Sequence, residues 1–332
     1  MNVISRDKLA AWIDDLVQDR TVIAPRDVEG VLLYRPVHSS AEVVWDYLRP
    51  AMSAKDALFP PTERLMLIDQ AGEHITLRES LPEDEQVMFG VRPCDARGLK
   101  VLDALFIEDD PPDSWYTRRR EHTTLVGLAC NQMGDTCFCT SMGVTPDDHR
   151  DMDVMLTEVE DGYAVQAVTP KGEALIQGLA LQHRPGDPPR QVITARLLFP
   201  QAEAWPSHFN DEYWEEMAER CLSCRLCAYV CPTCRCFDVR DETLAAGNGH
   251  RQYERIRCWD SCAGEVYRKI AGGHNPRAAK GQRLRNRFFC KFYYYPQQYG
   301  PLACTGCGRC IDACPVNIDI TEVMQHVSEV NP

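Results

Sequence analysis

Long hydrophobic runs are missing from this 332-residue sequence. The longest stretch without a charged residue, 292–308, contains only 17 residues and is interrupted by Pro296, Pro301 and two glutamines. It is too short and too polar to span a bilayer. The first residues are already polar, so we find no hydrophobic secretory region. Seventeen cysteines without such a region indicate reduced thiols and bound metal, and we expect a soluble, cytoplasmic protein without membrane insertion.

The sequence also lacks two common cofactor signatures. No G-x-G-x-x-G follows a strand-like segment, and no C-x-x-C-H is present for haem attachment. Outside one paired cysteine motif there is no internal repeat and no low-complexity segment. No set of residues in the sequence looks like a substrate site.

The paired cysteine motif is the strongest signal in the chain. Its copies are Cys221-Leu-Ser-Cys224-Arg-Leu-Cys227-Ala-Tyr-Val-Cys231-Pro232 and Cys304-Thr-Gly-Cys307-Gly-Arg-Cys310-Ile-Asp-Ala-Cys314-Pro315. Both read C-x2-C-x2-C-x3-C-P, the bacterial ferredoxin pattern for a [4Fe–4S] cluster, in which the fourth Cys binds the other cluster. Cluster 1 is therefore assigned to Cys221, Cys224, Cys227 and Cys314, and cluster 2 to Cys304, Cys307, Cys310 and Cys231. Zinc is the weaker alternative, because zinc ribbons use two C-x2-C pairs without a third Cys.

Charge is unevenly distributed along the chain. The net charge is −13, yet residues 232–303 carry 13 basic and 6 acidic side chains, or +7. A cubane with four thiolates is an anion, so nearby Arg and Lys would offset its charge and raise its potential. The competing interpretation of Arg283, Arg285 and Arg287 is a nucleic-acid patch. In an acidic protein with two clusters we do not expect nucleic acid as a partner.

The first half of the chain has the rhythm of a parallel α/β sheet. A strand over 86–91 runs into Cys94 and a helix over 96–105, and a strand over 123–128 runs into Cys130. Open α/β sheets bind ligands at the carboxyl ends of their strands. Since Cys137 and Cys139 follow in the next loop, we expect Cys94, Cys130, Cys137 and Cys139 to hold a third [4Fe–4S] cluster. Ordinary buried cysteines and a zinc site are the alternatives.

The Pro/Gly-rich stretch 184–190 is the clearest boundary in the sequence. We expect an α/β domain over residues 1–185 and a linker with a helix over 186–218. An α+β, bacterial-ferredoxin-like 2[4Fe–4S] domain should follow over 219–332, with a long insertion, 232–303, between its motifs. Helices are expected over 5–18, 170–181, 210–220 and 320–330, and a hairpin over 153–168.

Five further cysteines belong to none of these sets. They are Cys234, Cys236, Cys258, Cys262 and Cys290. Free Cys is commonly buried as a small apolar residue, so we expect them to pack around the clusters. A further thiolate site is the less favoured alternative.

Several strings are similar to those of a known family. They are 89–99 (FGVRPCDARGL), 135–141 (DTCFCTS), 153–157 (DVMLT), 231–239 (CPTCRCFDV), 259–262 (WDSC) and 274–277 (HNPR). Together they resemble the β subunit of cytoplasmic sulfhydrogenases and the corresponding iron–sulfur subunit of anaerobic sulfite reductases. The match covers about residues 86–320, and the first eighty residues match more loosely.

This resemblance implies an iron–sulfur electron-transfer subunit without a catalytic residue of its own. One partner would be a flavoprotein that binds FAD and NAD(P)H, and the other a catalytic subunit such as a nickel–iron hydrogenase or a sulfite or sulfur reductase. The alternatives are the iron–sulfur subunit of an anaerobic sulfite reductase, and an enzyme with an open iron in the N-terminal domain. Arg225 and Arg309 are candidates for tuning the cluster potentials, since nearby positive charge raises them.

Overall fold

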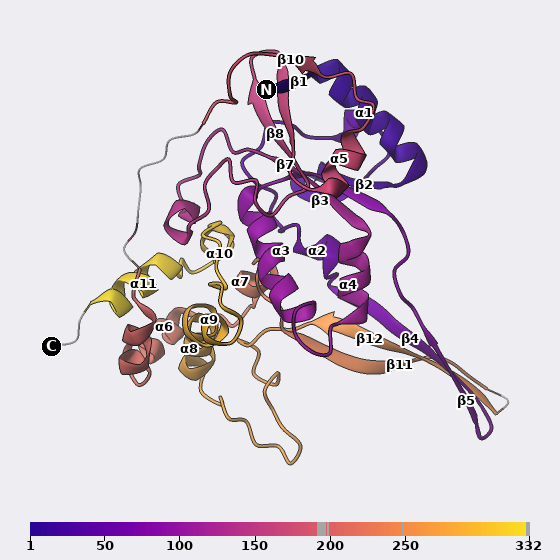
Figure 1. Ribbon diagram of the computed structural model, residues 1–332. Helices are drawn as coiled ribbons and strands as arrows, with labels where there is room; N and C mark the ends of the chain where they lie inside the picture. Colours follow the sequence, from indigo (N-terminus) through magenta and orange to yellow (C-terminus); the bar gives the residue numbers. More distant parts are fainter. Residues whose placement is uncertain (191–196, 198, 248, 330–332) are drawn as a thin grey trace.

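Two β-sheets and the helices packed on them make up the protein in this computed structural model, which describes residues 1–190, 197, 199–247 and 249–329 (Figure 1). The larger sheet has eight strands, in the spatial order β10 (Gln182–His183), β1 (Asn2–Ser5), β9 (Gly162–Ala167), β8 (Val154–Val159), β7 (Thr123–Leu128), β6 (Gln86–Val91), β2 (Thr21–Val28) and β3 (Val31–Val37). The four central strands, β8, β7, β6 and β2, are parallel. The outer pairings are antiparallel. The α/β class expected for the first half is thus present in the structure.

Helices cover both faces of this sheet, because side chains of its central strands alternate between two apolar clusters. Val87 and Phe89 of β6 pack with α1 (Arg6–Asp19) and α5 (Pro170–Ile176). Met88, between them, faces α2 (Lys55–Leu58), α3 (Pro93–Phe106) and α4 (Ser114–Glu121). Successive side chains of a strand point to opposite faces, and both faces of this sheet are covered. The central strands are therefore apolar at nearly every position.

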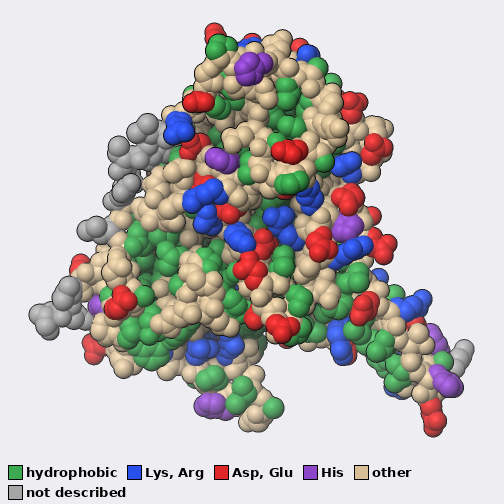
Figure 2. All heavy atoms as spheres, viewed as in Figure 1, with side chains coloured by type: hydrophobic (Ala, Val, Ile, Leu, Met, Phe, Trp, Pro, Cys, Tyr) green, Lys and Arg blue, Asp and Glu red, His purple; other side chains and the backbone are tan. Residues whose placement is uncertain are grey.

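The smaller sheet joins two distant parts of the chain. Its order is β11 (Phe237–Gly247), β12 (His250–Trp259), β4 (Thr62–Ala71) and β5 (His74–Glu79), all antiparallel. It extends from the body as an arm (Figure 1), and its far end carries His and charged side chains (Figure 2). Strands from the first half therefore pair with strands from the segment between the two cysteine motifs.

The C-terminal part is helical and packs around an aromatic core. Its elements are η3 (Ala202–His208), α6 (Tyr213–Arg220), α7 (Leu226–Tyr229), α8 (Lys280–Phe289), η4 (Cys290–Tyr294), α9 (Tyr295–Tyr299), α10 (Arg309–Asp312) and α11 (Ile320–Ser328). Trp205, Trp214 and Phe288 are buried there against Val323 and Met324 of α11. Hydrophobic side chains also gather on this part of the surface (Figure 2). None of the helices in the described part of the chain has the length and apolar character needed to cross a membrane.

Most predicted elements are present, but several bounds differ; the helix predicted over 96–105, for example, spans Pro93–Phe106. The helix predicted over 170–181 ends at Ile176, and Gly178 then adopts a φ of +86°. The helix predicted over 210–220 begins at Tyr213, with Glu212 at its N-cap and no side-chain hydrogen bond there. The hairpin β11–β12 was not expected. The helix predicted over 320–330 ends at Ser328. The predicted linker residues 191–196 and 198, and Val330, lie outside the described residues, and the domain limits stay a prediction.

Candidate metal centres

The first cysteine loop and Cys314 surround one cavity. Cys221 follows α6, Cys227 lies in α7, and Cys314 follows α10. These cysteines and Cys224 line the cavity together with Leu284 and Phe288. Backbone amides already point at the sulfurs, since Ser223 N–H donates to Cys221 Sγ at 3.4 Å and Ile318 N–H to Cys314 Sγ at 3.2 Å. The structure thus brings together the four residues assigned to cluster 1.

The second cysteine loop and Cys231 surround a deeper cavity. Cys231, Cys304, Cys307 and Cys310 line it beside Phe138 and Ile320. Burial raises the pKa of Cys304 to about 12. Thiols in this setting lose their protons only when a metal replaces them. The residues assigned to cluster 2 therefore also lie together, with the fourth cysteines exchanged between the loops as the spacing predicts.

Both loops place two residues in the left-handed region of φ. In the first loop these are Ser223 (φ 55°) and Arg225 (φ 67°), and in the second Gly306 (φ 66°) and Gly308 (φ 77°). A Cβ on Gly306 would lie 2.6 Å from Cys139 Cα, and one on Gly308 would lie 2.5 Å from the Thr136 carbonyl oxygen. The second loop needs glycine because another segment packs directly on it, whereas the first loop tolerates side chains.

That packed segment contains the third cysteine set. Cys94 is the second residue of α3, and Cys130 lies two residues after β7. Cys137 precedes η2 (Cys139–Met142), which begins at Cys139. Cys94 and Cys139 pack together with Cys307 in one buried apolar cluster. Burial, together with the nearby Cys130 and Cys137 thiols, raises the pKa of Cys139 to about 12. Phe138 N–H donates to Gly306 O at 2.8 Å. The four predicted residues are therefore gathered beside the second set.

The second cysteine set lies between the first and the third, and two buried cations adjoin it. Arg287 donates to Cys227 O at 2.8 Å and lines both cavities. Lys291 donates to Cys231 Sγ at 3.2 Å and to Ala303 O at 3.0 Å. Burial alone would lower the pKa of Lys291, but Cys231 and the neighbouring thiols raise it above its usual value. Both residues belong to the basic segment recognised in the sequence.

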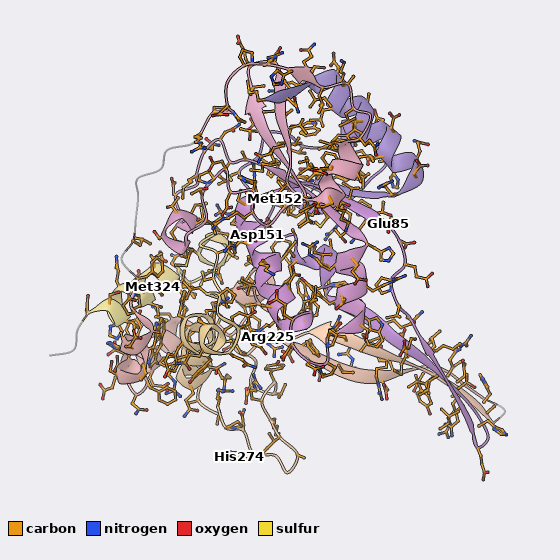
Figure 3. The ribbon with its side chains drawn as sticks, in the orientation of Figure 1. Glu85, Asp151, Met152, Arg225, His274 and Met324 are labelled. Carbon is orange, nitrogen blue, oxygen red and sulfur yellow. The ribbon has the colours of Figure 1, made fainter. Side chains whose placement is uncertain are left out.

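The two arginines proposed for tuning have different surroundings. Arg225 is one-third exposed, pairs with Asp260 at 3.1 Å, and lies near the start of the loop whose far end carries His274 (Figure 3). Arg309 is buried and holds Asp95 with two hydrogen bonds, of 2.7 and 2.8 Å, while its Nε donates to Pro50 O. Arg309 thus ties the second cysteine loop to the start of α3, a role that sequence reasoning missed.

The five unassigned cysteines lie along the insertion. The thiol of Cys234 contacts Cys231, and Cys290 accepts a hydrogen bond from Arg235 at 3.3 Å. Cys236 and Cys262 contact each other, and Cys258 lies in β12 beside Thr62.

Two other groups of polar residues are less suited to bind a metal or a cluster. His208, Asp211 and His326 place ligand atoms within 4.8 Å of one another, but Asp211 accepts hydrogen bonds from both rings, at 2.6 and 3.0 Å. Burial would raise the pKa of Asp211, and the two imidazoles lower it below its usual value.

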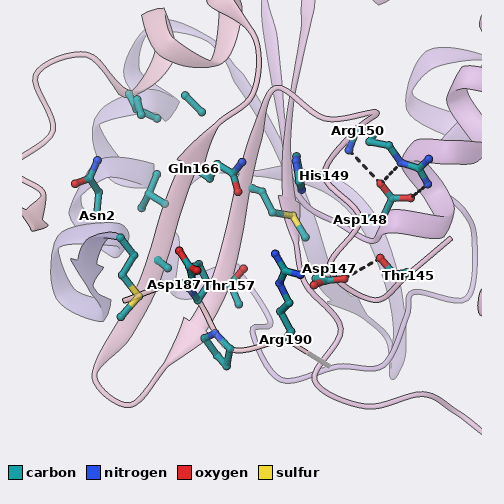
Figure 4. Close-up of a pocket in the computed structure, with 18 residues that line it drawn as sticks. Asn2, Thr145, Asp147, Asp148, His149, Arg150, Thr157, Gln166, Asp187 and Arg190 are labelled. Atoms are coloured by element: carbon teal, nitrogen blue, oxygen red, sulfur yellow. Dashed lines mark hydrogen bonds and ion pairs between the residues drawn. The ribbon is translucent and has the colours of Figure 1, made fainter. Parts of the chain in front are cut away.

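A hollow beside β8 and β9 is lined by the 145–150 loop and by Asp187 and Arg190 (Figure 4). Its Asp148 is already paired with Arg150, and no cysteine of the described residues lines it.

Comparison with known proteins agrees with this geometry. A family model described as a 4Fe-4S dicluster domain matches residues 220–318. Sulfhydrogenase 2 subunit beta from Pyrococcus furiosus is 32% identical over 311 residues, which cover 89% of this chain and 89% of that protein. The chain belongs to the sulfhydrogenase β-subunit family. No solved structure gives a significant match.

Membership of this family confirms the predicted iron–sulfur character of the chain. The dicluster match spans both ferredoxin-type loops and the insertion between them. The donor sets fit [4Fe–4S] groups, since each offers four cysteines in apolar surroundings, and amides point at sulfurs in the first set. The third set lies outside the matched residues.

Proposed function

We propose that the chain is an iron–sulfur electron-transfer subunit of a soluble, cytoplasmic multi-subunit oxidoreductase. Three [4Fe–4S] clusters would be held by the three cysteine sets, with the residues assigned above. The observation that carries this proposal is the contact of the third set with the second loop, through the hydrogen bond from Phe138 to Gly306 and the packing of Cys139 on Gly306. When bound, such clusters supply one-electron transfer.

The chain's own residues would provide the environment for this chemistry. Amides at Ser223 and Ile318 donate to cysteine sulfur, and Arg287 and Lys291 place positive charge where cluster anions would lie. Hydrogen bonds to sulfur, nearby charge and exposure set the potential of a cluster. The aromatic core around Trp214 and Phe288 packs against cysteines of the first and second sets, Cys221, Cys304 and Cys310.

The proposed partners rest on the family and on the exposed surface around the first cysteine set. The relative is named as one subunit of a sulfhydrogenase, so we infer a catalytic partner of the nickel–iron hydrogenase or sulfur-reductase type. An FAD- and NAD(P)H-binding flavoprotein would be the other partner. At the first set, Cys224 is exposed and flanked by Leu222 and Leu226, which are 64% and 43% exposed. Apolar side chains around an accessible cysteine are suited to contact with a protein subunit.

Iron and acid-labile sulfide per chain, measured anaerobically with EPR of the reduced protein, test the proposal. Three clusters predict about twelve of each, and two predict about eight. Cys130→Ser should lower the iron content from the three-cluster value, and Cys258→Ser is the matched control that should leave it unchanged. Unchanged iron in Cys94→Ser, Cys130→Ser, Cys137→Ser and Cys139→Ser would remove the third cluster from the proposal.

A further inference from the structure

Two cysteines outside all three sets lie in direct contact with each other. Cys236 immediately precedes β11, and Cys262 follows β12 by three residues. The strands hold their ends together, since Phe237 is opposite Trp259 and Asp260 N–H donates to Cys236 O at 2.9 Å. A turn closed by Gly264 N–H to Ser261 O, 2.8 Å long, then brings Cys262 back toward Cys236.

Three polar groups lie near the sulfur of Cys236 and favour its thiolate. They are the thiol of Cys262, the hydroxyl of Tyr267 and the backbone amide of Cys262. The Cys262 thiol and the other donors lower the pKa of Cys236 to about 6, against the opposing effect of burial. Donors around a sulfur favour its thiolate, the form that reacts with disulfides.

The surroundings of this pair are basic, and Cys236 is the more exposed of its two residues. Arg235 adjoins Cys236 and favours its thiolate, and Arg287, which donates to Cys234 Sγ at 3.5 Å, is close enough to act on Cys262. Cys262 is 7% exposed, whereas Cys236 is half-buried and lies beside the exposed loop that carries Val266 and Ile270. A small molecule would therefore meet Cys236 before Cys262.

We propose that Cys236 and Cys262 form a thiol–disulfide redox site, separate from the iron–sulfur ligands, that exchanges two electrons with small disulfides. The Cys236 thiolate attacks one sulfur of the external disulfide, whose S–S bond breaks and releases one thiol. Cys262 then attacks Cys236 Sγ, which releases the second thiol and forms the Cys236–Cys262 bond. The protein loses two electrons and two protons, and the external disulfide gains both to become two thiols.

Oxidation of this cysteine pair would also constrain the base of the arm. A bond between Cys236 and Cys262 would close the end of the β11–β12 hairpin where it leaves the cluster-binding part. The proposal does not depend on the number of clusters.

The test uses the full-length protein with its clusters, kept anaerobic and exposed to glutathione disulfide. Free thiols are then trapped with N-ethylmaleimide in acid, and the chain is digested with trypsin without reduction. We expect the peptide Cys236–Arg240 linked to the peptide Cys258–Arg268, with iron per chain unchanged. Absence of the linked pair in protein that retains its iron would overturn the proposal.

Variants separate this outcome from its competitors. Cys262→Ser should abolish the link and leave Cys236 as a mixed disulfide with glutathione. Cys258→Ser is the matched control in the same peptide and should keep the link. Loss of the link in Cys258→Ser, or loss of iron in both Cys236→Ser and Cys262→Ser, would contradict the proposal. An iron content of about eight, with the link still formed, would count against the third cluster and support the redox site.

Discussion

Arg287 and Lys291 are buried beside cysteine sulfur and backbone carbonyls, and among the described residues their hydrogen bonds go to no carboxylate. A buried charge is costly unless an opposite charge lies near it. Arg309, by contrast, is paired with Asp95. Arg287 and Lys291 therefore mark a place where an anion would be stabilised, which is the charge that a thiolate-bound cluster would bring.

Lys291→Met should lower the midpoint potential of the cluster that we assign to Cys231, Cys304, Cys307 and Cys310. The shift should be on the order of 100 mV, since a unit charge at ~6 Å and an effective dielectric constant of ~20 is worth about 3 kcal/mol. Potentiometric titration followed by EPR measures it. In the control Arg225→Met, the removed charge is partly in water and already offset by Asp260, so the shift should be much smaller. An unchanged or higher potential in Lys291→Met would contradict this account of Lys291.

At the scale of elements, the second cysteine loop packs directly against the segment that carries the third cysteine set. Gly306→Ala should destabilise the protein by about 2 kcal/mol beyond the backbone cost, because the new Cβ would overlap Cys139 Cα. Gly300→Ala is the matched control, since Gly300 also has a positive φ but no neighbour within 4 Å. Thermal unfolding and iron per chain compare the two variants. Equal losses would show that the loop contact contributes nothing.

Sequence reasoning predicted the elements whose pattern is local. Ser5 caps α1 by accepting from Lys8 N–H, and β6 and β7 have the predicted bounds because their residues are apolar throughout. The hairpin β11–β12 escaped prediction because nearly all of β11 is exposed and so lacks an apolar alternation. The strand β4, on which β12 pairs, lies in a distant part of the chain.

The candidate cluster sites, like the elements, could be predicted where their sequence pattern is local. Cysteine spacing alone assigned the first two sets, and strand-end positions suggested the third, which the structure also brings together. The partners of Arg309 could not be read from the sequence, because Asp95 lies 214 positions away from it. The contact between Cys236 and Cys262 was not expected either, because it depends on the unpredicted hairpin.

At the scale of the whole molecule, Arg257 fastens the arm to the α/β part. It is 1% exposed and its Nε donates to Glu63 Oε2 at 3.1 Å, while its Nη1 binds Asp113. Its guanidinium also lies over the rings of Phe59, Phe106 and Phe237. One side chain thus connects β12 with β4, α4 and the aromatic cluster below α3.

Arg257→Met should destabilise the protein by about 2–3 kcal/mol, because the buried Glu63 would lose one of its two cationic partners and keep only Arg119. Arg255→Met, in the same strand, removes an exposed pair with Asp241 and should cost about 0–1 kcal/mol. Thermal unfolding of both cluster-containing variants gives the comparison. Similar melting temperatures would mean that the arm is not fastened through Arg257.

The pairing of early with late strands has a consequence for biosynthesis. While the ribosome is still adding residues 80–250, β4 has no strand on the side that β12 will occupy, and an open strand edge invites pairing with other chains. With the ligands that we propose, cluster 1 would likewise need Cys314, which leaves the ribosome about ninety residues after the other three cysteines. Insertion of iron and closure of the arm are therefore expected after translation, with the nascent chain protected until both halves can meet.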